Sequence, residues 1–286
     1  MKTISIGFNT MDVYEHQQIM YPGGNELNTS IYAKWLEGES GYLGYFGDDD
    51  RSKHLIYALA YNGVDISRCK YLKGRSGIAI TNLVDGERVF IRTNGGGVSA
   101  KNPICLEEED LEYIQRFDLI LTGYYASYEA GGLGKLKRIG VPVAYDFSEE
   151  FTSDDLKEVC PGICMGFMSC SGRPEEEIRS LLKDVVGYGA KIAVATRGEE
   201  GQLVYDGQKF YSHSIVQEKV IDTMGAGDSF MTAFAIAYLK NRKKGGIGNA
   251  LEEASRFAAK VCGIKGAVGM GLPYEGKIAD ECGGCA

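Results

Sequence analysis

The sequence predicts an α/β fold in which a mostly parallel sheet is covered by helices and carries a small additional β-sheet. Three observations lead to this prediction. Between residues 107 and 196, apolar strand-like runs alternate with helical segments, which is the rhythm of a doubly wound sheet. Residues 77–92 interrupt that rhythm with two β-like runs joined by an Asp-Gly turn. Near residue 225, small residues connect a strand-like run to an apolar helix.

Length and composition fit one large α/β domain over residues 1–286. Hydrophobic residues make up 44% of the chain and aromatic residues 10%, which is enough for a sizeable core. The net charge of −8 argues against a nucleic-acid or anionic-membrane partner. The first residues turn polar too soon for a signal peptide, and the apolar run near 230–239 is too short to span a bilayer. We therefore expect a cytoplasmic protein.

Cysteine and histidine usage excludes some kinds of site. Eight scattered cysteines in a chain of this length do not suggest a disulfide framework. Cys282 and Cys285 have CxxC spacing without a second pair, so two free thiols in a tail are favoured over a zinc or redox site. With three histidines and no HExxH motif, a histidine-built metal site is not expected.

The first 36 residues predict a strand, a ligand-facing loop and a helix. Residues 3–8 alternate as a strand, and Asp12 follows the carboxyl end, where open α/β sheets bind ligands. A carboxylate there can accept two hydroxyl donors at once, although a surface-turn aspartate is the alternative. Gly24, Asn25 and Asn28 follow in a stretch that leads into a helix, and the two asparagine amides both donate and accept. An ordinary helix entry with asparagine as cap is the competing interpretation.

The next segments continue a βα unit and then leave it. Residues 41–47 predict a strand and residues 52–61 a helix. The hairpin at 77–92 should belong to a small sheet over 76–97, with residues 94–97 as its return hinge. Arg92 in this hairpin would reach a substrate or be an exposed charge.

From residue 107 the alternation resumes. Its apolar runs predict parallel strands that are buried on both faces. Helices are expected at 107–115, 129–139 and 153–159, and strands at 117–123, 141–147, 163–169 and 191–195, followed by a hairpin over 202–213 and a last helix at 248–262.

The run DTMGAGDSF at residues 222–230 carries the chemistry. Strand-like residues 219–221 precede it and an apolar helical run follows it. A helix start exposes free N–H groups and the positive end of its dipole, and small residues at 225–227 let an anion approach those amides. Asp228 would repel that anion, so its carboxylate is better explained as a base that takes a proton from an attacking hydroxyl. A glycine-rich helix cap is the alternative.

This run resembles the C-terminal signature of the ribokinase-like (PfkB) sugar kinases, and residues 23–28 (GGNELN) are similar to their N-terminal one. The resemblance spans about residues 3–270. It implies a ribokinase-like three-layer α/β/α sandwich whose β lid comes mainly from residues 76–97, with a contribution from about 10–22. It also implies ATP-dependent phosphorylation of a sugar hydroxyl, with Asp228 as the base and the amides of Gly225, Ala226 and Gly227 as the anion hole. The implied sugar-binding residues are Asp12, Gly24, Asn25, Asn28 and Arg92.

The resemblance further implies a nucleotide site and metal ions. Residues 196–201 (TRGEEG) are similar to the family's Thr-x-Gly-x-x-Gly loop, so Thr196, Gly198 and Gly201, with Thr223, are assigned to ATP. Glu175 is assigned to Mg²⁺ by its match to the family's Asn-x-x-Glu, with Glu176 as the alternative match, although the asparagine is missing here. Asp222 is assigned to a monovalent cation such as K⁺, and the lid to a homodimer contact.

Only the resemblance to known kinases limits the choice of substrate. Residues 47–50, 63–67, 146–148 and 221–224 look like the branch of the family that phosphorylates fructoselysine on its 6-hydroxyl. Fructose, ribose, ketodeoxygluconate or a nucleoside are the alternative substrates. A non-catalytic sugar-binding regulator is the alternative of another class, which the retained Asp228 opposes and the missing asparagine near 171 favours.

Overall fold

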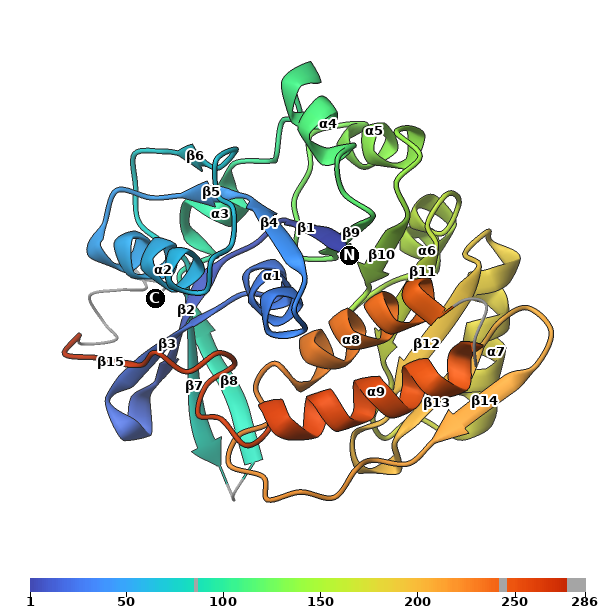
Figure 1. Ribbon diagram of the computed structural model, residues 1–286. Coiled ribbons are helices and arrows are strands. Elements are labelled where there is room, and N and C mark those ends of the chain that lie inside the picture. The colour runs from blue at the N-terminus through green and yellow to red at the C-terminus, as the bar shows by residue number, and fades with distance from the viewer. Residues whose placement is uncertain (85–86, 242–245, 277–286) are drawn as a thin grey trace.

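A computed structural model describes residues 1–84, 87–241 and 246–276. Within them, the main sheet has eight strands in the order β14-β13-β12-β11-β10-β9-β1-β4 (Figure 1). Strands β4, β1, β9, β10, β11 and β12 are parallel, and the β13–β14 hairpin extends the sheet antiparallel at one edge. The strands are β1 (Lys2–Ile6), β4 (Glu39–Leu43), β9 (Leu119–Gly123), β10 (Val143–Asp146), β11 (Met165–Ser169), β12 (Ile192–Thr196), β13 (Gln202–Tyr205) and β14 (Phe210–His213).

Helices cover both faces of this sheet, as the fold class requires. The helices α1 (Asn25–Trp35), α8 (Ala226–Asn241) and α9 (Gly246–Val261) lie over one face, with α2 (Asp50–Tyr61) beside α1 (Figure 1). The other face packs against α4 (Glu108–Ile114), α5 (Gly132–Arg138), α6 (Ser153–Val159) and α7 (Glu175–Gly187).

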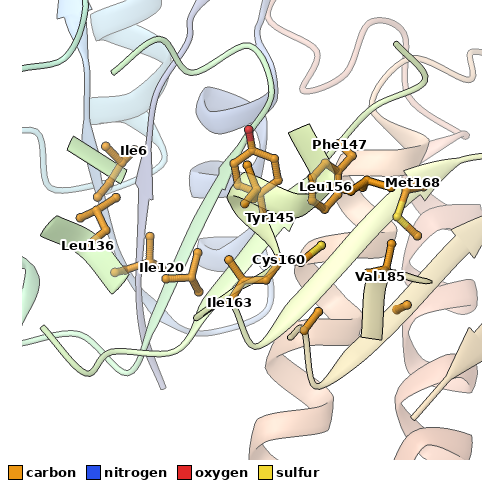
Figure 2. Packing of buried hydrophobic residues seen from close by; sticks show 14 of the residues in the cluster. Ile6, Ile120, Leu136, Tyr145, Phe147, Leu156, Cys160, Ile163, Met168 and Val185 are labelled. Atoms are coloured by element: carbon orange, nitrogen blue, oxygen red, sulfur yellow. The ribbon is translucent and has the colours of Figure 1, made fainter. Parts of the chain in front are cut away.

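A hydrophobic core lies on each face of the main sheet, because the side chains of a strand point alternately to the two faces. In β9, Leu119 and Leu121 join the core under α8, whereas Ile120 joins the core under α5 and α6. Figure 2 shows the second of these cores, with Ile120 beside Leu136 of α5. Successive side chains point to opposite faces, so a strand that is apolar at every position can only be buried on both sides. The predicted sandwich is confirmed.

A second sheet stands apart from the main one. Its order is β15-β3-β2-β7-β8, from β15 (Leu272–Pro273), β3 (Ile19–Gly23), β2 (Thr10–Tyr14), β7 (Ile78–Val84) and β8 (Glu87–Thr93) (Figure 1). Strands β7 and β8 form the predicted hairpin, whose Asp85-Gly86 turn lies outside the described residues. Strand β2 pairs antiparallel with β3 and parallel with β7, so the chain between residues 10 and 23 belongs to the same sheet.

Some predicted elements were wrong in type or extent. Residues 219–221 form no strand; Val220 and Ile221 are 60% and 52% exposed. The β13–β14 hairpin already occupies that end of the sheet, and the N–H groups of Ile221 and Asp222 donate to the Cys262 carbonyl instead, at 2.8 and 3.0 Å. The expected strand at 41–47 is divided into β4 and β5 (Tyr45–Phe46), which pairs with β6 (Lys70–Tyr71). The predicted hinge leads into a short helix, α3 (Gly97–Lys101).

No helix among the described residues has the length and apolar character needed to cross a bilayer. The cysteines of the described chain, at 69, 105, 160, 164, 170 and 262, are free thiols. Cys282 and Cys285 lie outside the described residues.

Candidate active site

A cavity of about 900 Å³ lies between the second sheet and the carboxyl ends of the parallel strands of the main sheet. Strand β2 contributes Asp12 and strand β8 contributes Arg92 to its lining. Helix α1 contributes Asn25 and Asn28, and the start of α8 contributes residues 225–228. All of the predicted sugar-binding residues and all of the predicted catalytic residues therefore line one cavity, although they come from distant parts of the chain.

Asp228 lies in the first turn of α8 and lines the cavity. The Asn28 amide Nδ2 donates to Asp228 Oδ2 at 2.8 Å. Burial raises the pKa of Asp228 to about 7; the Asn28 hydrogen bond opposes this shift and the nearby Asp146 charge adds to it. A carboxyl group with a pKa near neutrality can accept a proton under physiological conditions and give it up again, as a general base must.

The two glycines at the start of α8 have different surroundings. Gly225 has a φ of +76°, and a β-carbon there would collide with the Tyr32 hydroxyl and Ala267. Gly227 faces open space, so a ligand can approach its backbone. The Ala226 N–H donates to the Thr223 carbonyl at 3.2 Å, so this amide is already engaged. The exposed backbone at the helix start is thus centred on Gly227.

Two buried polar atoms of the cavity have no hydrogen-bond partner. They are Thr10 Oγ1 and Asn28 Oδ1, in residues that are 4% and 3% exposed. Buried polar atoms are nearly always paired in native proteins, so unpaired ones in a cavity point to a polar ligand. Asp12, 4% exposed, lies beside them in β2. A β-carbon on Gly23 would overlap the Asp12 carboxylate, which explains the glycine at that position.

Asn25 and Asp146 connect the start of α1 to the end of β10. Asn25 Nδ2 donates to Asp146 Oδ2 at 3.1 Å, and the Ser148 N–H donates to Asp146 Oδ1 at 2.9 Å. Burial raises the pKa of Asp146. Asp146 is therefore part of the wall of the cavity.

Glu26 is a buried acid that sequence reasoning missed. It is 2% exposed, and its Oε2 accepts a hydrogen bond from the Phe8 N–H at 2.9 Å. Burial raises the pKa of Glu26 to about 8, and the nearby Asp228 charge contributes to the shift. A β-carbon on Gly7 would overlap its side chain. In the sequence it resembles an ordinary first-turn glutamate, and only the long-range approach of residues 7 and 8 reveals it.

Replacing Glu26 with glutamine is expected to stabilise the protein at alkaline pH. A folded-state pKa above the unfolded value means that native Glu26 keeps its proton while the unfolded chain loses it, so wild-type stability falls as pH rises from about 4.5 to about 8. Glutamine removes this loss, which is on the order of 2–4 kcal/mol. Urea denaturation of both proteins at pH 5 and pH 8.5 measures it. Equal pH dependence of the two unfolding free energies would contradict this assignment.

The predicted nucleotide loop and metal ligand lie outside the residues that line this cavity in the described chain. Thr196 ends β12, and Gly198 and Gly201 flank a short 3-10 turn. Arg197 holds this loop: its Nη1 lies 2.9 Å from Glu175 Oε2. Glu175 also accepts from Arg179 Nε at 2.9 Å. A direct metal contact by Glu175 would therefore require these ion pairs to open.

Asp222 lies beneath the start of α8. It is 5% exposed, and its Oδ2 accepts from the Tyr14 hydroxyl at 2.7 Å and the Gly266 N–H at 2.9 Å. Its Oδ1 accepts from the Met224 N–H at 2.9 Å. These contacts fix the loop that leads to Gly225. Across the described ranges, no three His, Cys, Asp or Glu side chains form a group that could hold a metal ion.

Comparison with solved structures identifies the fold. A ribokinase of Arabidopsis thaliana, solved with ribose and ATP, superposes with a TM-score of 0.78 at 21% identity, covering 93% of this chain and 94% of that one. Adenosine kinase of Sinorhizobium meliloti superposes with a TM-score of 0.77 at 19% identity, covering 96% and 97%. The fold is therefore ribokinase-like, as the sequence predicted.

The sequence comparisons then give the family. Residues 4–127 and 166–268 match the sequence pattern of the pfkB family of carbohydrate kinases, so the chain belongs to this family. It is 39% identical to fructosamine kinase FrlD of Bacillus subtilis (strain 168), over 96% of this chain and 95% of that protein. It is 30% identical to fructoselysine 6-kinase of Escherichia coli (strain K12), over 93% and 100%. The protein is an ATP-dependent carbohydrate kinase.

Proposed function

We propose that this kinase transfers the γ-phosphoryl group of ATP to the 6-hydroxyl of a fructosamine, with fructoselysine as its substrate. The observation that carries the proposal is that Asp228, Asp12 and the open backbone at Gly227 share one cavity. A base, a hydroxyl-binding carboxylate and an anion-accepting helix start are the groups that phosphoryl transfer to a sugar needs. The names of the two relatives above support the choice of a glycated amine.

In this reaction Asp228 would take the proton of the attacking hydroxyl. Asn28 holds the carboxylate by its 2.8 Å hydrogen bond and so fixes the direction from which the base acts. The helix start at Gly225, Ala226 and Gly227 would stabilise the negative charge of the transferred group, chiefly at Gly227, because the Ala226 N–H would first have to leave the Thr223 carbonyl. Donors fixed before the reaction cost no reorganisation as the charge develops.

The sugar would bind on the side of α1 and the second sheet. Asp12 accepts from sugar hydroxyls, and the Thr10 hydroxyl and Asn28 Oδ1 gain the partners that they lack. Gly24, with a φ of +100°, brings backbone close to the ligand at the start of α1, beside Asn25. Arg92 faces the cavity from the second sheet, which would act as the lid.

Assignments for the nucleotide and the cations complete the proposal. Thr223 lines the cavity, and Thr196, Gly198 and Gly201 would bind ATP beyond it. When bound with ATP, Mg²⁺ would neutralise phosphate charge; it keeps several waters and needs few protein carboxylates, which fits the absence of a preformed cluster in the described chain. Glu175 as a Mg²⁺ ligand and Asp222 as a K⁺ ligand remain predictions, as does a homodimer through the second sheet.

An ATP-consumption screen tests the substrate. Fructoselysine, fructose, ribose, ketodeoxygluconate and adenosine are supplied separately, and the product is located by ³¹P and ¹³C NMR. We expect the highest kcat/KM for fructoselysine, with phosphate on O6. Faster turnover of another sugar or of the nucleoside would replace the substrate but keep the kinase. Tight sugar binding without ATP consumption would instead favour a regulator.

Activity is expected to depend on pH through Asp228. A general base must be ionised, and the pKa of Asp228 in the free protein is about 7, so kcat/KM should fall about tenfold per pH unit below pH 7. Above that value the activity should level off. Initial rates between pH 5 and 9 with limiting fructoselysine give the profile. A flat profile across pH 5.5–8 is incompatible with the assigned base.

Two glycine substitutions should separate fold from function at the helix start. Gly227→Ala places a methyl group in open space, so the fold is retained while kcat/KM for ATP falls roughly tenfold because phosphate approach is hindered. Gly225→Ala forces a side chain into a left-handed conformation and a collision, which should lower thermal stability. Differential scanning fluorimetry and ATP titrations measure both effects. Unchanged ATP kinetics in Gly227→Ala would show that the phosphate groups of ATP do not bind at the start of α8.

A further inference from the structure

The cavity is rich in negative charge although its co-substrate is an anion. Within the described chain its lining carries one guanidinium and five carboxyl groups, from Arg92 and from Asp12, Asp146, Glu149, Glu150 and Asp228. The three aspartates have structural or chemical tasks in the account above. Glu149 and Glu150 have none, and both are exposed.

The backbone presents these two glutamates to the cavity by an unusual turn. Ser148, directly before them, has a φ of +58°, a conformation that is uncommon for a residue other than glycine. It is held by its N–H bond to Asp146 and by the Ser169 N–H, which donates to the Ser148 carbonyl at 2.8 Å. Non-glycine residues in this conformation cluster at functional sites, because the surrounding structure must stabilise them.

The glutamates line the same cavity as the base. Asp146, which also lines it, lies between them and Asp228 in the account above, since its charge acts on Asp228 and its carboxylate accepts the Ser148 N–H. Glu150 follows Asp146 by four residues, at most roughly 14 Å of extended chain. A long substrate whose reacting hydroxyl lies at Asp228 can therefore extend past Asp146 to the two glutamates.

We propose that Glu149 and Glu150 bind the ammonium groups of the amino-acid arm of the substrate, and that Arg92 binds its carboxylate from the opposite wall. This inference rests on the proposed function and defines its substrate class as zwitterionic amino-sugar conjugates. Fructoselysine carries a secondary ammonium, an α-ammonium and a carboxylate, which matches two carboxylates and one guanidinium.

The end of the cavity that contains Thr10 and Asn28 fixes the orientation of the substrate. Thr10 Oγ1 and Asn28 Oδ1, buried and unpaired, mark where hydroxyl groups bind. Asn28 also contacts Asp228, so the polyol end lies beside the base. Glu149, Glu150 and Arg92 then meet the other end of the substrate. Ion pairs with hydrogen bonds to charged groups discriminate between substrates, because a neutral analogue cannot pair with the carboxylate.

Three substrates and four proteins test this assignment. The substrates are fructoselysine, its Nα-acetyl derivative, which lacks the α-ammonium, and its decarboxylated analogue, in which the amino acid is replaced by a diaminopentane. The proteins are wild type, Glu149→Gln/Glu150→Gln, Arg92→Gln and the control Glu108→Gln/Glu109→Gln. The control removes two adjacent exposed glutamates of α4, outside the cavity lining.

Wild type should prefer fructoselysine over each analogue by about tenfold in kcat/KM. Glu149→Gln/Glu150→Gln should lose the preference over the acetyl derivative, and Arg92→Gln the preference over the decarboxylated analogue. The control should keep both. Should a double variant misfold, the single variants Glu149→Gln and Glu150→Gln give the same comparison.

Other outcomes overturn the inference in distinguishable ways. If wild type phosphorylates all three compounds equally, or the variants keep the wild-type preferences, the arm is recognised elsewhere and only this inference fails. If wild type phosphorylates none of them but accepts another sugar, the proposed function fails together with it.

Discussion

Replacing Asp228 by asparagine is expected to lower kcat by roughly 10²–10⁴-fold while leaving the fold intact. The amide keeps the size of the carboxylate and still accepts the hydrogen bond from Asn28, but it cannot take a proton. It also removes a buried acid whose pKa is raised to about 7, so the variant should be no less stable than wild type at pH 8. Single-turnover rates at saturating ATP and sugar measure the chemical step.

The matched control is Asp154→Asn. Asp154 also lies in the first turn of a helix, α6, but its side chain is 92% exposed and pairs only with Lys157 among the described contacts. This variant should retain the wild-type rate. A single-turnover rate of Asp228→Asn close to wild type would show that the hydroxyl is deprotonated without Asp228.

The second large effect is expected at Asp12. Asp12→Asn keeps the shape of a residue that is 4% exposed, but it replaces one acceptor oxygen by a donor and removes the charge. Hydrogen bonds to charged groups contribute about 1.5–3 kcal/mol each, so kcat/KM for the sugar should fall roughly 10²–10³-fold. The KM for ATP should change little, because Asp12 belongs to the second sheet and not to the α8 loop.

Its control is Asp50→Asn in α2, where the side chain is 94% exposed and forms an ion pair with Lys53. The same chemical change there should leave both substrates unaffected. If Asp12→Asn lowered the affinity for ATP and sugar equally, Asp12 would support the fold of the cavity and would not recognise hydroxyl groups.

The parts of the site that could be predicted from the sequence are those formed by residues that are adjacent in the chain. The glycine-rich start of α8 and Asp228 follow from one stretch of sequence, because helix starts, small residues and first-turn acids are local features. The alternation of strands and helices is equally local, and most predicted elements differ from the structure by a few residues at their ends.

What could not be predicted depends on contacts between distant segments. Glu26 becomes a buried acid only because Gly7 and Phe8 pack against it. Thr10 matters because its hydroxyl is buried without a partner in the cavity. The β-branched residues at 220 and 221 favoured a strand, but the sheet was already extended by the β13–β14 hairpin. Glu175 matched a motif, yet Arg197 and Arg179 hold its carboxylate.

The most direct measurement is a crystal structure of the wild-type protein with fructoselysine and a non-hydrolysable ATP analogue. We predict that the 6-hydroxyl lies about 2.6–3.2 Å from the Asp228 carboxylate and that the γ-phosphate contacts the backbone at Gly227. A 6-hydroxyl out of hydrogen-bond reach of Asp228, with the γ-phosphate bound away from the start of α8, would contradict the account.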